Sequence, residues 1–208
     1  LMYAAIGGIA QAAATILMIK AMVLRSFAVG NALTKTEAAQ TAILGIIVLG
    51  EAVTPGVAAA IAVSLVGVML VSGPKWHSLF SRDAFLPALC GLGSGALFGV
   101  SGVCYRAASL SLELENFLWA AALVLAIVTG LQSIGMTAVM QKLSPGTPMT
   151  VVKGWRRTGI IGVISIAGSA CWFTAFSLEP AAHVRALGQV EMVFTFLAAI
   201  FFFRERIT

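Results

Sequence analysis

The sequence predicts an all-α protein, a polytopic bundle of about seven transmembrane helices. Two observations are compositional: the 208 residues are 60% hydrophobic and only 10% charged, and their mean hydropathy is +1.00. The third is that the apolar residues gather in runs about as long as a bilayer core is thick. A soluble domain is roughly 45–50% apolar and about 25% charged. Such a small number of charged residues cannot cover a water-exposed exterior, and we therefore expect lipid to solvate much of the surface.

Seven apolar runs are each close to the ~17–25 residues that cross a hydrocarbon core of about 30 Å. Backbone polar groups in lipid must be satisfied internally, and long unbroken runs achieve this as helices. Connections containing Pro and Gly separate several of the runs. In chain order, we expect spans at Leu1–Val23, Phe27–Leu49, Gly56–Ser72, Phe85–Tyr105, Phe117–Met140, Gly159–Leu178 and Ala181–Phe203.

Small residues recur at four-residue spacing in one of these spans, at Gly91, Gly95 and Gly99. Glycines at this spacing share one helix face and let a neighbouring backbone approach closely. We therefore predict that this face packs against another helix.

An internal repeat becomes visible when the chain is shifted against itself by 154 residues. The shift superimposes Glu37 on Glu191 and Glu51 on Glu205, so four of the seven glutamates share one register, and it also pairs Thr41 with Thr195. Rare acidic residues inside apolar helices are not expected to coincide in this way. The second and seventh spans are five crossings apart, so the two copies would run in opposite directions. Inverted repeats of this kind are the construction of many secondary transporters.

The chain resembles the drug/metabolite transporter superfamily in its EamA-type branch. The resemblance rests on a helix that ends in an apolar run and Glu51, followed by a Gly-rich helix that closes at Gly73, and on a second copy around Glu205. It implies two inverted five-helix repeats. Residues 1–73 would be the end of the first repeat, helices three to five, and residues 85–208 most of the second, helices six to nine. The chain opens inside a hydrophobic segment and stops directly after a charged helix end, so we expect a piece of a longer protein.

One feature departs from the pattern of that family. The family commonly has a helix-distorting Pro fourteen residues before the terminal Glu, whereas this sequence has Glu37 and Glu191 there. A mechanism that depends on a proline kink is therefore not expected here.

Charged residues near the bilayer midplane are the candidate functional groups. A central charge costs roughly 2.5–3.5 kcal/mol on insertion scales, so Lys35, Glu37, Arg185 and Glu191 should face a cavity or one another. One hypothesis is that Glu37 and Glu191, with Asn31 nearby, bind a cationic or amino-bearing substrate or exchange protons with it. The other is that Glu37–Arg185 or Glu191–Lys35 pairs only lock two helices together.

Four further residues of the repeat have simpler expected roles. Thr41 and Thr195 lie one turn beyond the midplane glutamates and could donate to them, although Thr in a membrane helix more often bonds its own i−4 carbonyl. Glu51 and Glu205 each end a helix beside a turn, which indicates a structural role in capping or in anchoring a loop.

The resulting functional prediction is a secondary transporter, by family resemblance an exporter, of a small metabolite such as an amino acid, an amine or a drug-like solute. It would be a multi-pass protein of the inner (plasma) membrane. We expect no enzyme activity, cofactor or metal site, since the sequence contains no HExxH or GxSxG motif and no His/Cys cluster. The net charge of +5 does not indicate nucleic acid, because the basic residues are scattered between apolar runs. The alternative is a membrane scaffold or assembly subunit that transports nothing.

Overall fold

The computed structural model describes residues 1–24, 33–72, 82–191, 193–194, 197 and 201. Within these residues every regular element is a helix, which confirms the all-α prediction. In chain order the helices are α1 (Met2–Val23), α3 (Glu37–Leu49), α4 (Pro55–Ser72), α5 (Arg82–Leu110), α6 (Phe117–Leu143), α7 (Thr147–Lys153), α8 (Trp155–Leu178) and α9 (Ala181–Gly188).

Four of these helices are long and apolar enough to cross a membrane, and they account for four of the expected spans. The spanning segments are Met2–Val23, Phe85–Leu110, Phe117–Leu143 and Trp155–Leu178, and shorter apolar helices cover Glu37–Leu49 and Pro55–Leu70. Large apolar side chains point outward from them, including Ile47, Leu70 and Ile164. Such a surface is stable against lipid chains, not against water.

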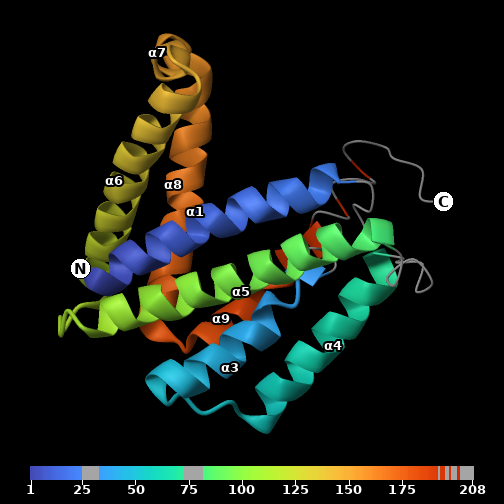
Figure 1. Ribbon diagram of the computed structural model, residues 1–208. Coiled ribbons are helices and arrows are strands. Elements are labelled where there is room, and N and C mark those ends of the chain that lie inside the picture. The colour runs from blue at the N-terminus through green and yellow to red at the C-terminus, as the bar shows by residue number, and fades with distance from the viewer. Residues whose placement is uncertain (25–32, 73–81, 192, 195–196, 198–200, 202–208) are drawn as a thin grey trace.

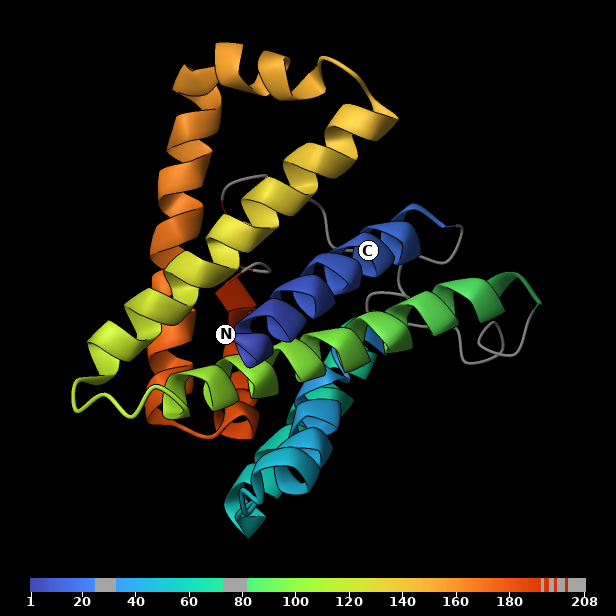
Figure 2. The same ribbon diagram turned by 60° about the vertical axis from the view of Figure 1, so that its left-hand side comes forward.

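The central helix of the bundle is α5, which contacts α1, α3, α6, α8 and α9. Helix α1 lies along one side of α5, while α3 and α9 lie on another side with α4 outside them (Figure 1). Helices α6 and α8 form a hairpin with α7 at its tip, and this tip extends well beyond the other helices (Figure 2).

The main core lies where α1, α5, α6 and α8 meet. Tyr105, Val124, Val128 and Phe176 are almost fully buried there, and Phe173 packs against Tyr105 with ring centroids 4.4 Å apart. A smaller apolar cluster joins α3, α4 and α9; its members are Ala38, Ala42, Ile61 and Ala182. The two clusters hold the short helices α3 and α9 against α5.

Two expected spans are interrupted. The span expected at 27–49 does not continue through Lys35 and Thr36, which form a turn, so α3 begins only at Glu37. The span expected at 181–203 is likewise broken by a turn at Gln189 and Val190, and the chain is helical again at Glu191.

Local hydrogen bonds explain both interruptions. At the first, Thr36 donates its backbone N–H and its hydroxyl to the carbonyl of Leu33, three residues earlier. At the second, Val190 donates its N–H to the carbonyl of Leu187. Bonds to the third preceding carbonyl tighten the backbone out of the α-helical pattern. Hydropathy does not register such a change, because it averages side-chain polarity over a window and carries no information on backbone hydrogen bonds.

Smaller differences occur at other helix ends. Helix α5 continues to Leu110, so Arg106 lies inside a helix and not in the loop where we expect it from the sequence. Helix α8 begins at Trp155 instead of Gly159, and the short helix α7 occupies part of the expected connection before it.

The glycine face of α5 packs as predicted. A Cβ on Gly95 would lie 2.9 Å from the backbone oxygen of Thr34, and one on Gly99 would lie 3.2 Å from the backbone nitrogen of Thr41. The backbone around the start of α3 therefore approaches α5 as closely as glycine permits.

We predict that Gly95→Ala lowers the thermal stability of the detergent-solubilised protein. The added methyl meets backbone atoms that cannot rotate away, and overpacking of this kind costs about 1–3 kcal/mol. Gly130→Ala on α6 is the control, because a Cβ there meets nothing within 4 Å. Equal melting temperatures for the two variants would show that the approach of α3 to α5 is not tight.

Candidate functional site

The two helix interruptions lie at positions that the 154-residue shift superimposes. Lys35 and Thr36 correspond to Gln189 and Val190, and each turn is followed directly by a glutamate, Glu37 or Glu191. Glu37 is the first residue of α3, where a carboxylate is stabilised by the exposed N–H groups of the helix start. The breaks occur without the proline that the family pattern commonly has at this point.

Glu37 pairs with Arg185 across the α3–α9 contact. The Arg185 Nη1 atom lies 3.7 Å from Glu37 Oε1, and the two side chains are only 11% and 12% exposed. Arg185 Nη2 also donates to the backbone oxygen of Phe98 on α5, at 3.2 Å. Because neither group can reach much solvent, each compensates the desolvation of the other.

Aromatic rings surround the Arg185 guanidinium. Its Cζ atom lies 5.1 Å from the ring centroid of Trp172, 5.4 Å from that of Phe176 and 5.8 Å from that of Phe98. Ring faces attract a cation, most strongly where it is desolvated. Among the described residues Arg185 Nε has no hydrogen-bond partner. The ring contacts and the ion pair with Glu37 therefore provide most of the interactions that stabilise this guanidinium in the interior.

A second ion pair joins the two interruptions. Lys35 Nζ donates to Glu191 Oε1, so Glu37 and Glu191 are each paired with a cation from the other half of the chain. The Lys35 side chain is 16% exposed, whereas that of Glu191 is 55% exposed. Glu191 is thus the more exposed of the two carboxylates, and Glu37 is the enclosed one.

Glu51 lies two residues beyond the end of α3 and binds Arg106. Arg106 Nε donates to Glu51 Oε1 at 2.9 Å, and Arg106 Nη1 donates to the backbone oxygens of Phe176 and Ser177 at 3.1 and 2.8 Å. Both side chains are largely buried. Gly50, at a φ of +65°, makes the left-handed turn that brings Glu51 to this position. One guanidinium therefore joins the ends of α3 and α8 to α5.

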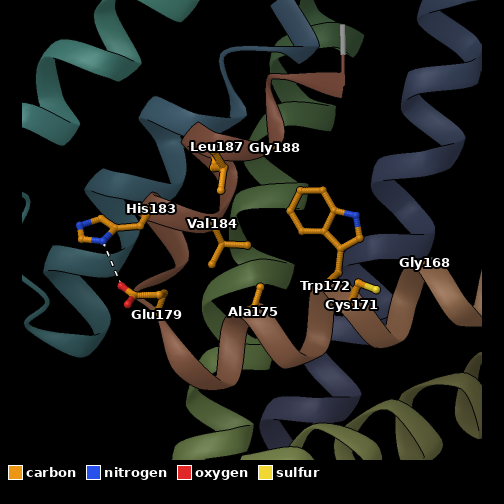
Figure 3. A pocket seen from close by; sticks show the side chains of 9 residues that line it. All are labelled: Gly168, Cys171, Trp172, Ala175, Glu179, His183, Val184, Leu187 and Gly188. Atoms are coloured by element: carbon orange, nitrogen blue, oxygen red, sulfur yellow. Dashed lines mark hydrogen bonds and ion pairs between the residues drawn. The ribbon is translucent and has the colours of Figure 1, made fainter. Parts of the chain in front are cut away.

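A groove of about 500 Å³ runs between α8 and α9 beside Arg185. Trp172 stands at one end of the groove against Gly188, and Glu179 and His183 form a pair at the other, 3.3 Å apart (Figure 3). A Cβ on Gly188 would lie only 2.3 Å from Trp172 Cη2. Only glycine at this position leaves room for the indole that covers Arg185.

A family model for EamA-like transporters matches residues 85–208, more than half of the chain. The chain belongs to the EamA-like transporter family. This confirms the drug/metabolite transporter resemblance and, with the apolar helices, a multi-pass membrane protein that acts on small molecules. Neither a curated protein nor a solved structure matches this EamA-like chain.

The structure brings together only part of the predicted site of this EamA-like protein. Lys35, Glu37, Arg185 and Glu191 form the two ion pairs described above. The Thr41 hydroxyl donates to the backbone oxygen of Glu37 at 2.7 Å, not to its carboxylate. Asn31, Thr195 and Glu205 lie outside the described residues. In the described part of the chain, no three His, Cys, Asp or Glu side chains are grouped to hold a metal ion.

Several polar and aromatic groups were not predicted from the sequence. Phe98, Trp172 and Phe176 surround Arg185, but an aromatic residue in an apolar run carries no distinguishing signal. Gln11 and Gln132 form a hydrogen-bonded cluster between α1 and α6. The signal for these two was present in the sequence, since a carboxamide is rare inside a transmembrane span and needs a partner there.

We predict that Arg185→Gln destabilises the protein and that adding Glu37→Gln restores part of the loss. Removing one member of a buried pair leaves an uncompensated charge, which costs about 3–5 kcal/mol, whereas the double variant leaves none. Thermal unfolding in detergent measures both effects.

Arg157→Gln is the matched control, because Arg157 is exposed near the start of α8. It should leave the melting temperature unchanged. If the stability losses of the two single variants simply add in the Glu37/Arg185 double variant, the two groups do not interact.

Proposed function

We propose that this EamA-like protein is a secondary transporter that exports a small metabolite, such as an amino acid, an amine or a drug-like solute, across the cytoplasmic membrane. Residues 1–73 would be the end of one repeat and residues 85–208 most of a second, inverted one. Rocking of one repeat against the other would expose the site alternately to the two sides of the membrane.

The observation that carries this proposal is the pair of helix breaks with an ion pair at each. Discontinuous helices near the midplane are the common site of substrate and ion binding in inverted-repeat transporters. Here both breaks place a carboxylate of one half beside a cation of the other, Glu37 with Arg185 and Glu191 with Lys35. Anything that competes for a carboxylate weakens the contact between the halves.

Glu191 would be the group that receives the competitor. More than half of its side chain is exposed, and a proton or an amino group bound there would displace the Lys35 ammonium. Loss of this pair would remove one of the two ion pairs described above and leave Glu37–Arg185, which joins α3 to α9. Protonation or substrate binding would in this way favour separation of the two repeats.

We predict that Glu191→Gln abolishes transport while leaving the folded yield unchanged. Glu37→Gln should also abolish flux per folded molecule, but it lowers stability because it leaves Arg185 without its counter-charge. A neutral carboxamide can still form a hydrogen bond, but it cannot exchange a proton or bind a cation by charge. The measurement is export of amino acids, amines, nucleosides and sugars from cells expressing the full chain, with and without a proton gradient, followed by flux in proteoliposomes.

Glu115→Gln is the control, since Glu115 lies exposed between α5 and α6. Wild-type flux in both the Glu37→Gln and the Glu191→Gln variant would show that the ion pairs only hold helices together. A reconstituted wild-type protein that moves none of the solutes would favour the scaffold alternative.

A further inference from the structure

A second cavity, of about 370 Å³, lies between α1, α6 and α8 and shares no lining residue with the ion pairs. Its walls are mostly apolar, with Ile16, Leu125 and Phe173 among them. Polar side chains reach it at Gln11, Thr15, Thr129, Gln132 and Ser169. None of the described residues that line it is charged.

A chain of hydrogen bonds fixes the orientation of both carboxamides. The backbone oxygen of Gly8 can only accept, so the group 3.0 Å from it must be the Gln132 nitrogen. That nitrogen also lies 3.0 Å from Gln11, which must therefore present its oxygen. The Tyr105 hydroxyl then donates to the same oxygen at 2.7 Å. Gln11 Oε1 accepts two bonds, and neither amide can be flipped without breaking the series.

This arrangement leaves one donor and one acceptor available. Gln11 Nε2 and Gln132 Oε1 have no hydrogen-bond partner within the part of the chain that the structure describes. The hydroxyls of Thr15 and Thr129, which also line the cavity, are already bonded to carbonyls of their own helices at 2.9 and 2.7 Å. Together with the Ser169 hydroxyl, which also lines the cavity, the two amide atoms are therefore the polar contacts that these side chains offer a ligand.

We infer that this cavity binds an uncharged, partly apolar solute whose polar end both donates and accepts a hydrogen bond, such as a primary carboxamide or an alcohol. The polar end bonds Gln11 Nε2 and Gln132 Oε1, and the apolar body packs against Phe173 and the aliphatic walls. A charged solute would lose its hydration without meeting a counter-ion, which is costly in an apolar site. The inference rests on the proposed function and narrows the solute carried to the uncharged, drug-like class, in place of amino acids and amines.

Ring contacts connect this cavity to the buried ion pair. Tyr105, which donates to Gln11, packs against Phe173 at 4.4 Å and against Phe176 at 6.4 Å. Phe176 in turn lies 5.4 Å from the Arg185 guanidinium. A solute in the cavity thus contacts a packed series of side chains that ends at Glu37–Arg185.

The test is equilibrium binding of three probes with one phenylpropyl body to the full chain in nanodiscs, measured by calorimetry. We expect saturable binding of 3-phenylpropanamide, binding of 3-phenylpropanoate weaker by at least about tenfold, and no saturable binding of propylbenzene. Equal binding of all three probes, or of none, would overturn the inference without any variant being made.

Gln132→Leu removes the acceptor but leaves the Tyr105–Gln11 bond intact, so we expect a folded protein that binds the amide on the order of tenfold more weakly. Gln141→Leu, at an exposed site on the same helix, should bind like wild type. Unchanged binding of the amide by Gln132→Leu would show that Gln132 does not make the proposed contact. The binding experiment measures no flux. Its failure therefore does not bear on the transport test of the glutamate variants, and failure of the transport test does not bear on the binding result.

Discussion

The contact on which the bundle depends is the buried ion pair between Glu37 and Arg185. It lies where α3, α5, α8 and α9 meet, with both side chains nearly removed from solvent. In an apolar interior neither charge is tolerable alone, so the pair holds the start of α3 and the middle of α9 together in this conformation. The surrounding features serve this contact: glycines on α5 admit the α3 backbone, and Trp172 and Phe176 cover the guanidinium.

Much of the bundle could be predicted from the sequence because hydropathy reports burial in lipid directly. Runs that become α1, α5, α6 and α8 are long and uniform, so only their ends differ from expectation. Both ion pairs were also accessible from the sequence, because four charges at mid-depth have few alternatives to pairing. Hydropathy cannot show where a helix breaks. The turns at Thr36 and Val190 depend on hydrogen bonds three residues apart and on packing, and no proline marks them.

The polar groups that could not be predicted from the sequence are those whose structural role depends on a partner distant in the chain. Arg106 looks like a loop residue until α5 is seen to continue past it and Glu51 to fold back onto it. Gln11 and Gln132 are 121 residues apart, and each becomes informative only when the other is beside it. On the proposed function, the charged site and the amide site would divide the work of a carrier: the ion pairs would hold the halves together, and the neutral cavity would select what is carried.

The most direct test of this division is to prevent the separation of α3 and α9. Cysteines at Ala38 and Ala182, two members of the buried cluster between these helices, would be oxidised to a disulfide in a protein whose native cysteines are replaced. We predict that cross-linked proteoliposomes lose flux and recover it when the link is reduced. Equal flux in the linked and reduced states would contradict the claim that the contact between the halves opens during transport.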